Sequence, residues 1–166
     1  SVMPYRSTRW SAMSVEDLKV YRQAWFDLLL PLIDEFDPDV IHAHHLWILG
    51  SMVKDLAPSI PVVSHCHATG LRQMSLCPDL AEGVRRGCRR NEAFAVLHRD
   101  HALRLHRELE IPEERIHIVG AGFNPDMFHR RGRTGRPAPQ LLYTGKYAHS
   151  KGLPWRLDAC EGVRQE

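Results

Sequence analysis

Short apolar runs alternate with longer amphipathic segments along most of this chain of 166 residues, and this alternation restricts the fold more than any other feature. The runs predict buried strands at 40–44, 61–65, 93–97, 115–119 and 141–144. The segments beside them predict helices at 14–36, 46–57, 79–91 and 100–109 and from 153 onward, with a polar loop through Gly70 and Pro78. Strands that alternate with helices are joined by right-handed crossovers, so we expect an α/β fold with a parallel sheet and helices on both faces.

The first predicted helix has a recognisable start and an apolar side. Ser14 and Asp17 have the spacing of a capping box, and Glu16 adds a second acidic residue to the first turn. Six apolar residues recur at helical spacing and are expected to face a core: Leu18, Tyr21, Trp25, Leu28, Leu29 and Leu32.

Composition and charge exclude several classes of protein. Apolar residues make up 43% of the chain and charged residues 25%, which favours a packed domain over a disordered chain. The 22 basic and 20 acidic side chains leave a net charge of +2, too balanced for nucleic acid to be the expected partner. The longest apolar stretch, at 25–33, is interrupted by Asp27 and Pro31, so no membrane span is expected. With no apolar signal core at the start and no CxxC pair among four cysteines, we expect a cytoplasmic protein.

Histidines gather where the predicted strands end. His44 and His45 close the first strand, His65 and His67 lie at the end of the second, and His98 follows the third. In a parallel α/β sheet, ligands bind outside the carboxyl ends of the strands. We therefore expect the functional site at this edge.

A metal site at these histidines is one interpretation, because zinc prefers imidazole and thiolate ligands. Adjacent residues of a strand point to opposite faces, however, and no carboxylate accompanies the histidines at a helical spacing such as HExxH. We therefore assign no metal ligands, and we expect His42 and His65 to be buried strand residues with satisfied hydrogen bonds. His67 lies just past its strand, and we assign it a role in the site.

Four motifs in order carry a resemblance to a known family. They are PDVIHAHH at 38–45, PVVSHCHATG at 61–70, ERIHIVGAGFNPDMF at 114–128 and LLYTGKYAHSKGL at 141–153. Over roughly residues 36–160 the chain resembles the family 4 glycosyltransferases of the GT-B fold, whose two domains are Rossmann-like. The resemblance implies a retaining, metal-independent transferase of the hexosyltransferase type. Its co-substrate would be a nucleotide sugar, that is, a sugar linked to UDP or GDP, and no other cofactor is implied. The sequence does not identify the acceptor.

The resemblance also assigns roles to residues. It places His67 at the donor sugar and phosphates as the catalytic residue, and it places Gly145, Lys146, Lys151 and Gly152 at the donor diphosphate. Fixed cations there stabilise the negative charge that develops on a leaving nucleoside diphosphate. The acceptor cleft, or the cleft between the domains, is expected at His44, His45, Thr69, Gly70, Gly120, Gly122 and Asn124.

The same comparison divides the chain into three parts. Residues 1–128 are expected to be most of an N-terminal domain, with Phe128 as its closing hydrophobic anchor. The Arg-, Gly- and Pro-rich segment 129–140 is interpreted as a linker, and 141–166 as the first strand and helix of the donor-binding domain. Since the first glycine is Gly50, the family's glycine-rich turn is expected upstream of this sequence, and the family's acidic motif downstream. We expect an internal fragment that is inactive alone.

Two alternatives and one surface feature remain open. The histidines would also suit a zinc-dependent hydrolase, and an exposed sheet edge would suit a non-catalytic assembly module that forms a homo-oligomer. Five arginines form a basic surface that is either solvated or in peripheral contact with an anionic membrane: Arg72, Arg85, Arg86, Arg89 and Arg90.

Overall fold

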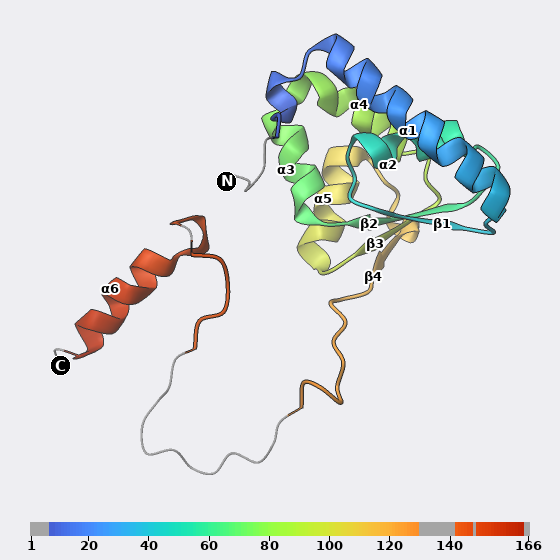
Figure 1. The fold of residues 1–166 in the computed structure, drawn as a ribbon. Coiled ribbons are helices and arrows are strands. Elements are labelled where there is room, and N and C mark those ends of the chain that lie inside the picture. The colour runs from blue at the N-terminus through green and yellow to red at the C-terminus, as the bar shows by residue number, and fades with distance from the viewer. Residues whose placement is uncertain (1–6, 130–141, 148, 165–166) are drawn as a thin grey trace. The chain divides into compact units, whose positions relative to one another are not determined.

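The computed structural model describes residues 7–129, 142–147 and 149–164 of the chain. It divides into two compact units, 1–122 and 123–166, which are described separately below. The first unit contains a sheet and most of the helices (Figure 1).

Four parallel strands form the sheet of the first unit. They are β1 (Ile41–His44), β2 (Val62–Cys66), β3 (Ala93–Val96) and β4 (Ile116–Ile118), and they lie in the order β1-β2-β3-β4. In the register of β1 and β2, His44 lies opposite His65. The parallel α/β sheet of the Rossmann-like kind and the first four predicted strands are confirmed.

Helices connect the strands. The connections contain α2 (Ile48–Leu56), α4 (Pro78–Cys88) and α5 (Arg99–Leu109), and these three helices were expected from the sequence. The polar loop predicted around Gly70 is wrong, because these residues form a further helix, α3 (Ala68–Leu76). Short 3-10 turns at Trp10–Ala12 and Glu113–Arg115 complete the regular structure of this unit.

One face of the sheet carries the hydrophobic core. Strand and helix residues on this face are fully buried and belong to one hydrophobic cluster. The strands contribute Cys66, Phe94 and Val96, and α4 and α5 contribute Val84, Leu105 and Leu109. The buried Asn91 Nδ2 donates hydrogen bonds to Ser64 Oγ at 2.7 Å and to the Gly50 carbonyl oxygen at 3.3 Å, which fixes α2 over this face. In Figure 1, α2 and α4 lie on the same side of the strands.

The other face of the sheet is open among the described residues of this unit. His42 and His44 on β1 and His117 on β4 point to it and are exposed, and Val63 and His65 on β2 are only partly buried. Among the described helices of this unit, the expected cover is therefore present on one face only. The strand order explains this, since successive right-handed crossovers between neighbouring strands place every connecting helix on the same side.

The first helix, α1 (Val15–Phe36), begins where the sequence predicts. Ser14 Oγ accepts a hydrogen bond from the Asp17 N–H at 3.1 Å, and Asp17 Oδ2 accepts one from the Ser14 N–H at 2.9 Å, which completes the capping box. Partly buried side chains pack toward the core at Leu18, Tyr21 and Trp25, and Leu29 is also partly buried.

Two residues of α1 differ from the prediction. Leu28 and Leu32 are 52% and 49% exposed. Among the described elements α1 packs mainly on α2, and one stripe of the helix is enough for that contact. The helical spacing identified the helix correctly but overestimated the width of its buried side.

The second unit contains a short 3-10 turn, His149–Lys151, and α6 (Leu153–Arg164), which begins where expected. Residues 142–144 form no strand, contrary to the prediction for 141–144; Leu141 lies outside the described residues. An apolar run becomes a strand only beside a partner strand, and no described residue of this unit provides one. All of the predicted linker except His129 also lies outside the described residues. None of the described helices is both long enough and apolar enough to cross a membrane.

Candidate functional site

The carboxyl ends of β1 and β2 bring the predicted histidines together. The His45 N–H donates a hydrogen bond to the His65 carbonyl oxygen at 3.1 Å, which extends the pairing of the strands by one residue. His67 is the N-cap residue of α3. The His44 Nδ1 and His67 Nε2 atoms are 3.1 Å apart and share a hydrogen bond. The predicted site residue therefore contacts the end of the neighbouring strand.

His67 lies among other imidazoles. Its ring centroid is 4.7 Å from that of His45 and 4.6 Å from that of His65. Partial burial lowers the pKa of His67 below its ordinary value, and the charges that His65, His45 and His44 would carry lower it further. The His67 imidazole is therefore mainly neutral near pH 7, and it can exchange hydrogen bonds with a ligand without adding a charge.

A third strand contributes histidines to the same edge. His98 is the N-cap residue of α5, and its ring centroid is 3.9 Å from that of the buried His101. Burial lowers the pKa of His101, as do the neighbouring His98 and Arg104. The sequence identified His98 at this edge but not His101, which lies one helical turn further along the chain.

The expectation for His42 and His65 is wrong. His42 is exposed, and His65 is partly buried with an Nε2 atom that has no hydrogen-bond partner among the described residues. Both side chains point to the open face of the sheet, where none of the described helices supplies a partner. Partial burial and the neighbouring histidines His44, His42 and His45 lower the pKa of His65.

A pocket of about 270 Å³ opens beside these histidines. Four of the seven residues predicted for the cleft line it: His44, His45, Thr69 and Gly70. The other lining residues are Trp10, Tyr21, Trp47, Leu49, Gly50 and Gln73. The pocket therefore combines imidazole, hydroxyl and amide groups with aromatic walls.

The aromatic walls were missed at the sequence level. Trp10 lies edge-on to Tyr21, with ring centroids 5.1 Å apart, and edge-on to Trp47 at 5.9 Å. Trp47 Nε1 is buried and has no hydrogen-bond partner among the described residues. The position of Trp47, two residues after the His44-His45 pair, was the available signal. Trp10 precedes the first helix and offered none.

The remaining predicted cleft residues lie beyond β4. The Val119 N–H donates to the Val96 carbonyl oxygen at 2.9 Å, and the left-handed Gly120 (φ +69°) then turns the chain away. Asn124 Oδ1 accepts hydrogen bonds from the N–H groups of Asp126 and Met127, so its side chain stabilises a local turn. Gly122 is exposed, and so is Phe128, which was expected to be a hydrophobic anchor.

The predicted diphosphate residues belong to the second unit. Lys146 and Lys151 are exposed, and Lys151 and Gly152 come immediately before α6, whose first turn contains Pro154 and therefore offers an anion fewer N–H groups than an ordinary helix N-terminus. Gly145 and Gly152 have positive φ angles of 156° and 72°. The Tyr143 hydroxyl donates to the Lys146 carbonyl oxygen at 2.8 Å and holds this turn.

The arginine surface is partly neutralised within the chain. Arg89 pairs with Glu110 at 2.7 Å and also donates to the Leu109 carbonyl oxygen, and Arg90 pairs with Asp55 at 2.5 Å. Arg72 and Arg86 are exposed.

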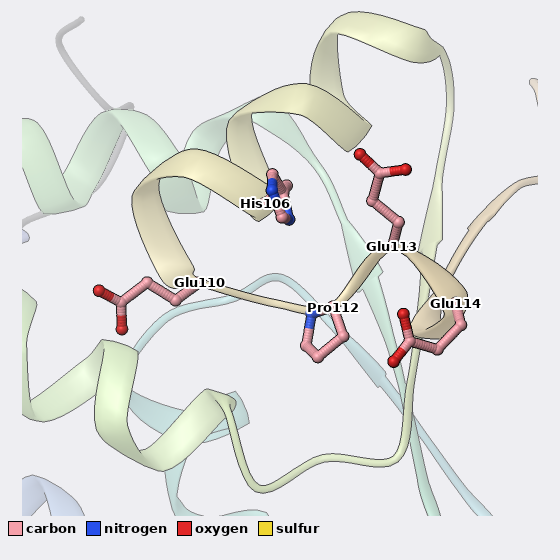
Figure 2. Close-up of a pocket in the computed structure, with 5 residues that line it drawn as sticks. All are labelled: His106, Glu110, Pro112, Glu113 and Glu114. Atoms are coloured by element: carbon pink, nitrogen blue, oxygen red, sulfur yellow. The ribbon is translucent and has the colours of Figure 1, made fainter.

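A second hollow lies where α5 ends and β4 approaches, lined by His106, Glu110, Pro112, Glu113 and Glu114 (Figure 2). The three carboxylates point in different directions, and His106 Nδ1 shares a hydrogen bond with the Ile111 carbonyl oxygen at 3.0 Å. This hollow lies at the amino end of β4, away from the edge where parallel sheets bind ligands. We assign no site to it.

Comparison with known proteins adds one match. Residues 2–122 match a family model described as a glycosyl transferase 4-like domain, and this stretch includes the whole described sheet and the histidine edge. No curated protein sequence matches the chain.

Proposed function

Since this chain belongs to the glycosyl transferase 4-like domain family, we propose that it takes part in transferring a hexosyl group from a nucleotide sugar to an acceptor, with His67 facing the donor. The family match favours this function over the zinc-dependent hydrolase and the assembly module. The observation that carries the proposal is the position of His67, at the N-terminus of α3 and in hydrogen-bond contact with His44.

The chemistry of transfer suits these groups. The bond between the anomeric carbon and the donor phosphate oxygen breaks, and a bond between that carbon and an acceptor oxygen forms as the acceptor hydroxyl passes its proton to the departing phosphate oxygen. Negative charge collects on the leaving nucleoside diphosphate, which is UDP or GDP. A neutral His67 donates a hydrogen bond to the donor, and the N–H groups at the start of α3 supply partial positive charge.

Lys146 and Lys151 bind the diphosphate in this proposal. Both are exposed, and Lys151 stands at the N-terminus of α6, so two cations and a helix N-terminus are available to the same anion. In this proposal the chain by itself is not expected to transfer sugar.

The pocket beside the histidines receives the acceptor. Trp10, Tyr21 and Trp47 offer aromatic surface, on which the apolar face of a sugar ring or an apolar acceptor tail packs. Thr69 and Gln73 offer hydrogen bonds to hydroxyl groups. Transfer at this site takes place in the cytoplasm, and contact with an anionic membrane through the arginine surface would bring a lipid-borne acceptor close.

Titration calorimetry of the chain with UDP and with GDP tests the donor half of the proposal. Weak binding of one of them is expected, together with its loss in Lys146→Ala/Lys151→Ala. The matched control is Lys19→Ala, an exposed lysine on α1 whose ion pair among the described residues is with Glu16. If neither nucleotide binds, or if the double variant binds as well as the original chain, the diphosphate assignment is wrong.

The role of His67 needs a separate measurement. Crosslinking with a photoreactive nucleotide sugar is expected to label peptides near α3, and His67→Ala is expected to reduce the labelling. His117→Ala, which removes an exposed histidine of β4, is the control. Equal labelling of His67→Ala and His117→Ala would contradict the donor-facing role.

A further inference from the structure

Three histidines of the open sheet face converge on one point. His42 and His44 are two residues apart on β1 and therefore point to the same face, and His65 lies directly opposite His44 on β2. We call His42, His44 and His65 the histidine triplet. His44 and His45 are adjacent and point to opposite faces, whereas the three members of the triplet share one face.

The distances within the triplet suit a shared ligand. The ring centroids of His42 and His44 are 4.4 Å apart, those of His44 and His65 are 5.4 Å apart, and those of His42 and His65 are 5.7 Å apart. One nitrogen from each ring lies within 4.8 Å of the other two. Ligand nitrogens of a tetrahedral zinc ion are about 3.4 Å apart, given zinc–nitrogen bonds of about 2.0–2.1 Å. His42 and His44 are exposed, so their rings can turn inward by the small amount required.

The triplet also contains an unmet hydrogen-bonding group. His65 Nε2 is buried and has no partner among the described residues. A buried polar atom without a partner is costly, and native structures usually provide one. A ligand held by the triplet would provide it, because an imidazole nitrogen that lacks a proton is an electron-pair donor.

From this geometry we propose that His42, His44 and His65 bind a divalent transition metal, with zinc as the reference ion, on the open face of the sheet. Three imidazole ligands leave a fourth position for water or another ligand. The triplet contains no carboxylate, so it favours zinc, nickel or copper over magnesium, calcium or manganese.

His67 would support the metal indirectly, through its hydrogen bond to His44. When His44 binds the ion through Nε2, its Nδ1–H donates the hydrogen bond to His67 Nε2 that the structure already contains. Such a partner fixes the orientation of a metal-binding imidazole and increases its basicity. A metal ion bound by the triplet would therefore also fix which ring nitrogen of His67 carries the proton.

The test is zinc binding by the full chain without a histidine tag. After treatment with a chelator and dialysis, calorimetry with zinc chloride is expected to show one ion per chain, and magnesium chloride is expected to show no binding. His42→Gln and His44→Gln, two substitutions at exposed positions that should not disturb folding, are each expected to abolish stoichiometric binding. His67→Gln is expected to weaken binding by about tenfold, as for a supporting partner.

The matched control is His117→Gln, which removes an exposed histidine from the same face of the sheet but outside the triplet. It should bind zinc as the original chain does, and far-ultraviolet circular dichroism should show all variants folded. Less than one zinc ion per chain would overturn the proposal. So would zinc binding that His42→Gln and His44→Gln leave unchanged, or that His117→Gln removes equally.

Discussion

Gly70 lies against the backbone of Leu46: a Cβ atom added to Gly70 would be 2.5 Å from the Leu46 carbonyl oxygen and 3.0 Å from its carbonyl carbon. The contact joins the first turn of α3 to the loop between β1 and α2, and so holds His67 beside His44. Because the obstructing atoms belong to the backbone, they cannot rotate away.

Gly70→Ala is therefore expected to lower the free energy of unfolding by about 1–3 kcal/mol, the usual cost of overpacking. Urea denaturation measures this change. Gly83→Ala is the matched control, since Gly83 is exposed within α4 and an added Cβ meets nothing within 4 Å. That variant should be more stable by about 0.5–1 kcal/mol. Equal effects of the two substitutions would contradict the close contact at Gly70.

Asn91→Ala should destabilise the sheet of the first unit. The substitution leaves the Ser64 hydroxyl and the Gly50 carbonyl oxygen without their hydrogen-bond donor in a fully buried place. We expect a loss of about 1–3 kcal/mol in the free energy of unfolding. Gln23→Ala, which removes an exposed amide whose hydrogen bond among the described residues is to Asp27 on the same helix, should change it by less than about 0.5 kcal/mol. If Asn91→Ala left the free energy of unfolding unchanged, these hydrogen bonds would not contribute to stability.

The stability of the chain should fall as the pH decreases through the range where histidine titrates. Burial, His98 and Arg104 lower the pKa of His101 below 6.5, while Asp100 acts in the opposite direction. Below about pH 6.5 the unfolded chain binds the proton before the folded chain does, so the free energy of unfolding decreases with decreasing pH. Above that pH both states are neutral at this position, and no further gain is expected.

Urea denaturation at about pH 7.5 and about pH 5.5, in the presence of a chelator, measures this loss. His101→Gln should reduce the difference between the two pH values, whereas the exposed His117→Gln should not. If both variants retain the full difference, His101 is not its source.

The arginine surface makes a prediction about membranes. Arg72 and Arg86 are exposed, whereas Arg89 and Arg90 pair with carboxylates. In a flotation assay, the chain should float with vesicles that contain anionic lipid. The double variant Arg72→Ala/Arg86→Ala should reduce the floated fraction. The control Arg22→Ala/Arg107→Ala, which removes two exposed arginines from α1 and α5, should reduce it less. High salt should also reduce it. Binding that is independent of lipid charge would exclude the contact.

The sequence predicted the sheet well because strand runs and helical spacing are local signals. It missed α3, whose residues 68–76 include Gly70 and Ser75 and show little periodicity; the contact of Gly70 with Leu46 becomes visible only in three dimensions. It wrongly predicted a strand at 141–144, because an apolar run carries no information about its partner.

The candidate site was predicted only in part, because the sequence shows local patterns but not which distant segments come together. The rule for parallel sheets placed His44 and His45 at this edge, the family resemblance added Thr69 and Gly70, and all four line one pocket. The burial of His42 and His65 was wrongly predicted, since a strand's own residues do not reveal whether a helix covers each face. Trp10 reaches the pocket from a segment that carries no strand or helix signal.

The strand order β1-β2-β3-β4 never reverses among the described strands, so they contain no switch point of the kind where doubly wound sheets open a ligand crevice. The pocket lies instead at β1, an outer strand of the described sheet, and its outer wall consists of Trp10 and Tyr21, from the segment that precedes this strand. The end of β1 and the helix α3 thus provide the polar side of the pocket, and Trp10 with Tyr21 of α1 provides a separate aromatic wall. If the pocket receives the acceptor as proposed, exchanging residues in that wall would change acceptor choice and leave the histidine edge intact.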